Sequence, residues 1–445
     1  MKIEEALKFC TDTNDIIIGN GALEQVGSLF TRQFPHHRAK VIADKITYNI
    51  AGRKVCEILQ ANGIKQDDPY IFEDQNLFAE WAFIDRLVNM LNDTDAIAIA
   101  VGSGTINDLC KLSSHMTGRR YMSVGTAASM DGDTSFGASI TKHGVKQDFS
   151  CRAPQAWLGD TAIIGEAPRS MTASGYADLF AKTVAGADWI LSDELGIEAI
   201  DPNAWSIIQD NLANALAHPK EIYEKKTQAI KELVEGLIFS GLAMQAHRSS
   251  RPASGADHQF SHLWNMEHHT HLGRQVSHGF QVSIGTLSSS ALYECALKED
   301  FENLDVEECM SKWPSKKHMV NDAYALFKKS DFPSIGKTEI AEKYIEPGDL
   351  RKELTRLKER WPIIKDRLKK QLIPFDEIKK RLQQVGAPVS PEEIGIGREY
   401  LKETYVKAQY IRRRYTILDL ATRTGKMNRW LEELFGPGGR WYQQQ

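Results

Sequence analysis

The chain has 445 residues, of which 42% are hydrophobic and 26% are charged, and its formal net charge is −4 at pH 7. This length predicts two domains, and the composition is that of a globular protein. The small excess of acids argues against nucleic acid as the main partner, because phosphate backbones attract basic faces. No apolar run approaches the roughly 20 residues of a membrane helix, so we expect no membrane insertion.

The first residues, MKIEEALKFCTDTND, carry acids where a signal peptide has a basic and then an apolar stretch. We therefore expect a cytoplasmic protein. The six cysteines are scattered and include no CxxC pair, which favours reduced structural thiols over disulfides or a thiolate metal site.

Residues 15–167 alternate short apolar runs with amphipathic segments. Strands are predicted at 39–45, 95–104 and 121–129, and helices at 47–62 and 105–116. This alternation predicts an α/β domain with a doubly wound parallel sheet, a Rossmann-like nucleotide-binding domain. In such sheets, ligands bind beyond the carboxyl ends of the strands.

The segment VGSGTINDLCK, residues 101–111, follows a predicted strand and opens a predicted helix. Gly102 and Gly104 let a ligand approach the backbone closely, and the helix start offers free N–H groups to phosphate. The GxGxxG fingerprint is absent, so the segment is either a nucleotide cradle or a plain tight turn. Asp44 ends an earlier strand and is either a ribose ligand, which favours NAD over NADP, or an ordinary turn acid.

Residues 168–435 are predicted to form an all-helical second domain, because apolar residues recur at helical spacing. Helical periodicity extends over 171–196, 225–247, 377–385 and 399–421. The basic run Arg412–Arg414 is interpreted as a helix surface or a salt-bridge face. The last ten residues, GPGGRWYQQQ, are predicted to be a loose tail.

Six of the 13 histidines lie between Gly255 and Gly279. His258 and His262 are spaced i, i+4, so on a helix they share a face and are either two metal ligands or one ligand and one substrate contact. The HExxH pattern is missing, because Gln259 stands in place of its glutamate. His278 begins another predicted helix, and the remaining three histidines are assigned to a polar loop.

A third ligand is expected on another element. Asp178, in GYADLFAK, lies among small and apolar neighbours, where an aspartate without a partner is costly to bury. Asp178 is therefore either a metal ligand or an ion-pair partner of Lys182.

Five segments occur together in an order that resembles the glycerol-1-phosphate dehydrogenases, which belong to the dehydroquinate synthase and iron-dependent alcohol dehydrogenase superfamily. The bacterial branch, encoded in some arabinose operons, is the most similar. The segments are GSGTIND (102–108), VGTAASMDGDTS (124–135), GYADLFAK (175–182), SSRPASGADHQFSH (249–262) and SHGFQV (277–282).

The resemblance implies that Asp178, His258 and His278 bind one divalent ion, which is Zn²⁺ or Ni²⁺, with Fe²⁺ as a further candidate. It also implies that Asp131, Asp178 and His262 are catalytic residues that face the substrate. Arg251, in SSRPASG, is predicted to bind the substrate phosphate; its alternative roles are to cap a helix end or to pair with Asp257.

The same resemblance implies NAD(H) as the cofactor, with NADP(H) as the alternative. Thr126, Ser129 and Ser135 are expected to add cofactor contacts to those of Asp44. The pyrophosphate cradle is expected to comprise Gly102, Ser103, Gly104, Thr105, Ile106 and Asp108.

The implied reaction is the interconversion of dihydroxyacetone phosphate and sn-glycerol 1-phosphate by hydride transfer, in a homodimer that acts on a small phosphorylated triose. Either Asp131 or His262 is expected to deliver the proton. The alternatives are a glycerol or polyol dehydrogenase of the same superfamily, a dehydroquinate-synthase-like lyase, and a non-catalytic metal- and nucleotide-binding protein.

Overall fold

The computed structural model describes residues 1–74, 77–142 and 145–443. Its tertiary contacts divide the chain into two units. The first comprises Met1–Leu179, Asp201–Ala253 and Gln384–Gly386, and the second comprises Phe180–Ile200, Ser254–Gln383 and Ala387–Gln445. Within the described residues, no helix is both long and apolar enough to cross a membrane.

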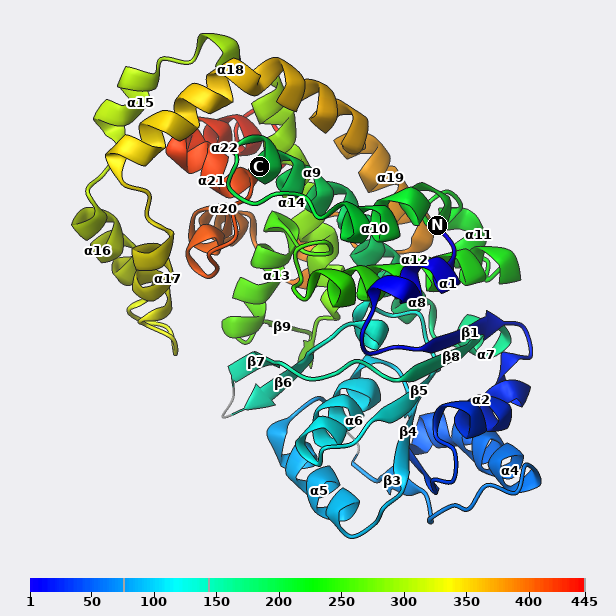
Figure 1. The fold of residues 1–445 in the computed structure, drawn as a ribbon. Helices are drawn as coiled ribbons and strands as arrows, with labels where there is room; N and C mark the ends of the chain where they lie inside the picture. Colours follow the sequence, from blue (N-terminus) through cyan, green and yellow to red (C-terminus); the bar gives the residue numbers. More distant parts are fainter. Residues whose placement is uncertain (75–76, 143–144, 444–445) are drawn as a thin grey trace. The chain divides into compact units, whose positions relative to one another are not determined.

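The first unit contains a six-stranded parallel sheet, which confirms the predicted doubly wound architecture (Figure 1). In spatial order the strands are β1 (Asp15–Gly19), β8 (Ala156–Asp160), β5 (Tyr121–Gly125), β4 (Ile97–Gly102), β2 (Ala39–Asp44) and β3 (Tyr70–Phe72). The sequence predicted three of these strands, β2, β4 and β5. It did not predict the two edge strands, β1 and β3, or β8, which lies beside β1.

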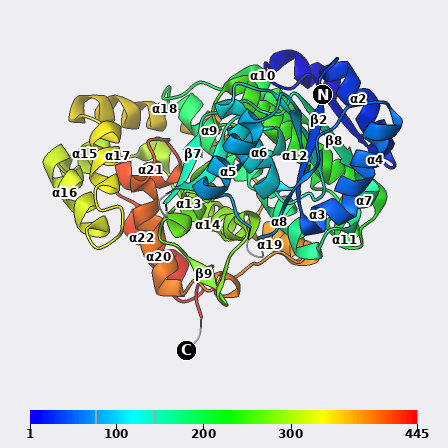
Figure 2. The ribbon, with the colours of Figure 1, turned by 90° about the horizontal axis from the view of Figure 1, so that it is seen from below.

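Helices cover both faces of this sheet, which is why its central strands are apolar throughout. Along β4, Ile97 and Ile99 pack in a cluster with α2 (Val26–Gln33) and α4 (Arg53–Ala61), whereas Ala98 and Ala100 pack in a cluster with α5 (Trp81–Asn92) and α6 (Gly104–Met116). Figures 1 and 2 both show α5 beside α6 and α2 beside α4. The short α1 (Ile3–Ala6), α3 (Lys45–Thr47) and α7 (Thr161–Glu166) complete this part.

The strand order reverses direction between β2 and β4. From β2 the chain continues outward to β3, and from β4 it continues the other way to β5 and β8. The carboxyl ends of β2 and β4 therefore flank the switch point where such sheets bind ligands. Asp44 ends β2 and Gly102 ends β4. A hairpin of β6 (Ala138–Lys142) and β7 (Val145–Phe149), which was not predicted, follows later in the chain.

Four helices beyond residue 167 also belong to the first unit, so the contacts do not divide the chain at the expected domain boundary. Two glycines explain the close packing. A Cβ at Gly175 would lie 2.1 Å from the carbonyl oxygen of Ala128, and a Cβ at Gly241 would lie 2.2 Å from Oγ1 of Thr134. The helices are α8 (Arg169–Phe180), α10 (Pro202–Ala215), α11 (Pro219–Tyr223) and α12 (Thr227–His247).

The second unit is helical, as predicted, apart from a small hairpin of β9 (Thr270–His271) and β10 (Arg274–Gln275). Its helices are α9 (Lys182–Glu194), α13 (Ala256–Met266), α14 (His278–Lys298), α15 (Val306–Lys312), α16 (Lys316–Phe327), α17 (Ile335–Lys343), α18 (Pro347–Gln371), α19 (Phe375–Val385), α20 (Arg398–Lys407), α21 (Ile417–Arg423) and α22 (Met427–Phe435).

The helix expected over 399–421 is interrupted, because α21 has its own start signal. Thr416 and Asp419 form a capping box there, in which Asp419 accepts a hydrogen bond from the Thr416 N–H at 2.9 Å. The basic run therefore lies between α20 and α21 rather than on a helix surface. One of its members does form the expected salt bridge, since Arg413 pairs with Glu339 at 3.2 Å.

The predicted loose tail is partly wrong. Trp441 is buried, and its indole N–H donates to the hydroxyl of Tyr405 at 2.8 Å. Arg440 pairs with Glu294 at 2.8 Å. A large aromatic side chain and a cation with an acidic partner thus hold this segment against the second unit.

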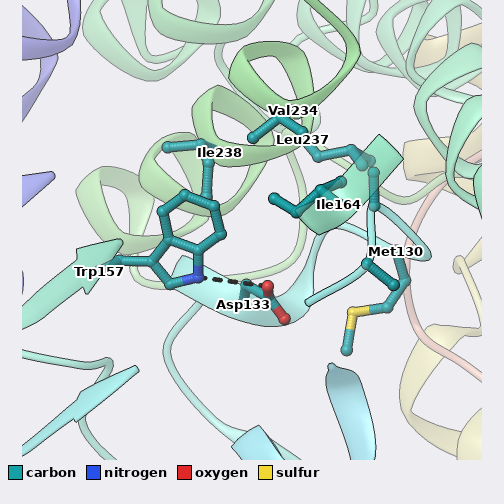
Figure 3. A pocket seen from close by; sticks show the side chains of 9 residues that line it. Met130, Asp133, Trp157, Ile164, Val234, Leu237 and Ile238 are labelled. Carbon is teal, nitrogen blue, oxygen red and sulfur yellow. Dashed lines mark hydrogen bonds between the residues drawn. The ribbon is translucent and has the colours of Figure 1, made fainter. Parts of the chain in front are cut away.

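A buried acid lies in a small cavity of the first unit (Figure 3). Apolar side chains from α12 and α7 surround the cavity, and the indole N–H of Trp157 donates to Asp133 at 3.2 Å. Burial raises the pKa of Asp133 from 3.8 to about 7, although Lys111 and the Trp157 hydrogen bond oppose this rise. Asp133 in the folded protein is therefore largely protonated below pH 7 and about half protonated near pH 7.

We predict that the free energy of unfolding of Asp133→Asn, taken relative to that of wild type, increases as the pH rises. Asp133 of the wild-type protein releases its proton near pH 4 in the unfolded chain and near pH 7 in the folded chain. The free energy of unfolding of the wild type therefore decreases between these two pH values and does not decrease further above pH 7 through this group. The free energy of unfolding of the variant, relative to wild type, should rise by up to about 4 kcal/mol between pH 4 and 8. Urea titrations at several pH values measure it.

Asp85, an exposed acid on α5, provides the control: Asp85→Asn makes the same chemical change in water. A constant difference between Asp133→Asn and wild type across this pH range would show that Asp133 ionises as easily in the folded chain as in the unfolded one.

Candidate functional site

Helices α13 and α14 bring two of the predicted metal ligands together. His258 is the third residue of α13 and His278 is the first residue of α14, and their ring centroids lie 5.2 Å apart. The helices approach closely because a glycine faces the contact: a Cβ at Gly285 would lie 2.1 Å from the carbonyl oxygen of Asp257. A larger residue there would push α14 away from α13.

Asp178, near the end of α8, is fully buried, and its Oδ2 accepts a hydrogen bond from the backbone N–H of Asp131 at 3.0 Å. Asp178, His258 and His278 each offer one ligand atom, and these atoms lie within 4.8 Å of one another. One carboxylate and two imidazoles at this spacing suit a divalent transition-metal ion.

His262 lies one helical turn after His258, with ring centroids 6.2 Å apart, and is half-buried. Two of the three remaining histidines of the cluster contact other groups. Nε2 of His268 lies 3.1 Å from Oδ2 of Asp331, and Nε2 of His269 lies 2.6 Å from the carbonyl oxygen of Ile394. The helical face that carries His258 therefore also carries His262, as the i, i+4 spacing predicts.

Asp131 belongs to the segment after β5 that packs against α12. Its side chain is mostly buried, and its Oδ2 accepts a hydrogen bond from the hydroxyl of Ser240 at 2.7 Å. Because its N–H also binds Asp178, the backbone of Asp131 is fixed relative to that carboxylate.

The glycine turn ends β4 and begins α6, a helix of 13 residues whose first N–H groups have no partner within the helix. The loop after β5 is tied to this turn, because the N–H of Thr126 donates to the carbonyl oxygen of Gly102 at 3.0 Å. A Cβ at Gly104 would lie 2.6 Å from Cε of Met130, so a larger residue there would require the end of that side chain to move. Ser103, Thr105 and Ser129 are half-buried in these two segments.

Two of the predicted cofactor contacts are engaged within the protein. Oδ2 of Asp108 accepts a hydrogen bond from the Ser139 N–H at 3.3 Å, while Oδ1 lies 3.5 Å from Nζ of Lys111. The hydroxyl of Ser135 donates to the carbonyl oxygen of Gly132 at 3.0 Å. Both side chains hold the segment between β5 and β6, and their contacts to a cofactor stay predictions.

Asp44 caps α3, since its Oδ1 accepts a hydrogen bond from the Thr47 N–H at 2.7 Å. This hydrogen bond matches one of the two predictions for Asp44, that of an ordinary turn acid. Its position at the end of β2, beside the switch point, leaves the ribose role as a further prediction.

Arg251 is fully buried, and its backbone N–H donates to Oγ of Ser249 at 3.1 Å. A phosphate can reach the guanidinium only if the residues that cover it move. The phosphate role and the structural roles of Arg251 both stay predictions.

Two buried acids beside the candidate ligands were not assigned a role in this site from the sequence. Asp257 contacts the Nδ1 of His258, and Asp188 of α9 accepts a hydrogen bond from the Ala256 N–H at the start of α13. An acid adjacent to a predicted ligand was a usable signal for Asp257. Nothing in the local sequence distinguishes Asp188 from any other helical acid.

Comparisons with known proteins place the chain in a family. A family model described as iron-containing alcohol dehydrogenase matches residues 17–168. The glycerol-1-phosphate dehydrogenase [NAD(P)+] of Halalkalibacterium halodurans is 36% identical over 270 residues, which are 60% of this chain and 67% of the relative. The protein of that name from Pyrococcus horikoshii is 31% identical over 66% of this chain and 82% of the relative.

Solved structures have the same fold. A probable glycerol dehydrogenase from Sinorhizobium meliloti superposes with a TM-score of 0.59 at 16% identity, covering 95% of this chain and 98% of the other. A sulfoacetaldehyde reductase from Bifidobacterium kashiwanohense, in complex with NAD+, superposes with a TM-score of 0.58 at 13% identity, covering 94% and 97%. The relatives in sequence, together with the shared fold, show that the chain belongs to the glycerol-1-phosphate dehydrogenase family of the iron-containing alcohol dehydrogenase superfamily.

Proposed function

We propose that this protein interconverts dihydroxyacetone phosphate and sn-glycerol 1-phosphate with NAD(H), or alternatively NADP(H). The observation that carries the proposal is the convergence of Asp178, His258 and His278 on one small volume. In the reducing direction, the substrate carbonyl carbon gains a hydride from the reduced nicotinamide and its oxygen gains a proton. Relatives named glycerol-1-phosphate dehydrogenase [NAD(P)+] support this substrate.

One divalent ion fits the donor set, since a buried carboxylate and two imidazoles offer one negative charge and two neutral nitrogens. Zn²⁺, Ni²⁺ and Fe²⁺ all accept such ligands. When bound, the ion supplies a Lewis acid for the carbonyl group of the substrate. Asp178 is the ligand whose orientation the chain fixes by a backbone hydrogen bond, from the N–H of Asp131.

Two side chains are candidates to hold the transferred proton. The carboxylate of Asp131 accepts a hydrogen bond from Ser240, which orients it. His262 lies on the same face of α13 as His258 and has the imidazole chemistry suited to proton transfer near neutral pH. We retain both.

The cofactor is expected at the switch point of the sheet. The first N–H groups of α6 are suited to a pyrophosphate, and Asp44 at the end of β2 is suited to a ribose hydroxyl, which favours NAD over NADP. Thr126, Ser129 and Ser135 complete the proposed contacts. We also expect a homodimer, as the resemblance implies.

We predict that the metal-loaded protein oxidises NADH with dihydroxyacetone phosphate and that kcat/KM for free dihydroxyacetone is lower by roughly 100-fold or more, because a site built for phosphate is left unpaired without it. Chelation should abolish both activities, and re-addition of the metal should restore them. Absorbance at 340 nm follows the reaction, and chiral analysis of the product identifies the sn-1 isomer.

Equal or better turnover of free dihydroxyacetone would move the assignment to a polyol dehydrogenase of the same superfamily. Full activity after complete removal of metal would overturn the role of the ion.

We predict that Arg251→Gln raises the KM for dihydroxyacetone phosphate by about 10- to 100-fold, as expected when a charged hydrogen bond is lost, and leaves the KM for NADH nearly unchanged. Arg248→Gln is the matched control, because Arg248 lies in the same segment but is exposed. A lower Tm with both KM values unchanged would instead make Arg251 a structural residue.

A further inference from the structure

Asp257 is a fully buried acid on the first turn of α13, directly before the candidate ligand His258. Both of its carboxylate oxygens have partners. Oδ1 accepts a hydrogen bond from the Gly255 N–H at 3.1 Å, and Oδ2 contacts the Nδ1 of His258. A carboxylate accepts hydrogen bonds only, so this contact places the proton of His258 on Nδ1 and leaves the lone pair on Nε2.

A second buried acid fixes the place where α13 begins. Asp188 of α9 accepts hydrogen bonds from the Ala256 N–H at 2.7 Å, from the hydroxyl of Tyr293 on α14 at 2.6 Å and from the Ile417 N–H at 2.8 Å. Three donors from α13, α14 and the start of α21 thus converge on one carboxylate. This arrangement holds the first turn of α13 against α14.

Asp188 and Asp257 leave no space for a side chain at position 255, which is a glycine. A Cβ at Gly255 would lie 2.3 Å from Oδ2 of Asp188 and 2.9 Å from Oδ1 of Asp257. On its other side, the backbone of Asp257 touches α14 at Gly285. The position of the Asp257 carboxylate is therefore set by packing on both sides of the helix.

The same helix supplies a polar group to the other candidate histidine. Oγ of Ser261 lies 3.4 Å from Nδ1 of His278. Each imidazole consequently has its Nδ1 beside a side chain of α13.

Resting on the proposed function, we propose that Asp257 is a positioning residue for the metal site: its carboxylate holds His258 in the tautomer that presents Nε2 to the ion, and Asp188 holds Asp257 in place. Carboxylates that accept the second N–H of a metal-binding histidine orient the ring and raise its basicity. The competing interpretation is that Asp257 only stabilises the N-terminus of α13 as a helix-start acid.

Asp257→Asn tests the proposal, because asparagine has one acceptor oxygen where the site needs two. Its NH₂ group must face either the Gly255 N–H or the Nδ1–H of His258, and a second donor favours the wrong tautomer. We expect Co²⁺, titrated into the metal-free protein and followed by its visible absorption in competition with a chelator, to bind about 10- to 100-fold more weakly than to wild type.

Asp349→Asn is the matched control, since Asp349 also lies in a first helical turn, of α18, but is exposed and binds Lys352 at 2.8 Å. It should bind Co²⁺ as wild type does. Thermal unfolding of the metal-free variants reports any loss of fold.

A second measurement does not depend on the variant. In wild-type protein labelled with ¹⁵N-histidine, NMR should show the His258 ring, identified by the signals lost in His258→Gln, with its proton on Nδ1. This result decides the proposal if Asp257→Asn does not fold.

The outcomes separate the two levels of the account. If wild-type protein takes up no Co²⁺, the proposed metal site itself fails. If wild type binds one ion and Asp257→Asn binds it equally well, or if the proton of His258 lies on Nε2, the positioning role is overturned while the proposed function stands.

Discussion

The close approach of α13 and α14 at Gly285 is the constraint on which the candidate metal site depends. The hydrogen atom of this glycine occupies the space that a Cβ would take 2.1 Å from the carbonyl oxygen of Asp257. With the helices this close, the ring centroids of His258 and His278 lie 5.2 Å apart. Interiors are close-packed, so one added methyl group at Gly285 would be relieved by movement of a helix that carries a ligand.

The chain stabilises four of its buried aspartates, each in a different way. Asp188 accepts three hydrogen bonds from protein donors, whereas Asp257 divides its oxygens between a backbone N–H and an imidazole. Asp178 accepts a hydrogen bond from the backbone N–H of Asp131, and one of its oxygens lies within 4.8 Å of a ring nitrogen of each candidate histidine. Asp133 lines a largely apolar cavity, and burial raises its pKa to about 7. Burial of an acid is costly unless the acid is paired, bound to a metal ion or protonated.

The sequence predicted much of this, and where it failed the cause is physical. Continuous apolar runs predicted the inner strands β2, β4 and β5. The inner strand β8 was missed although all five of its residues are buried, and the edge strands β1 and β3 were missed as well. The i, i+4 spacing of His258 and His262 predicted their shared face. The part of Asp188 was not predictable, because its three donors lie far apart in the chain and meet only after α13, α14 and α21 pack around it.

The central claim, that Asp178, His258 and His278 bind one divalent ion, is tested most directly by anomalous diffraction at the zinc edge from crystals of the zinc-loaded protein. The account predicts one peak, bonded to a carboxylate oxygen of Asp178 and to a ring nitrogen of each histidine at about 2.0 to 2.2 Å. An active, zinc-containing protein whose peak lies elsewhere, with these three side chains unbound, would contradict it.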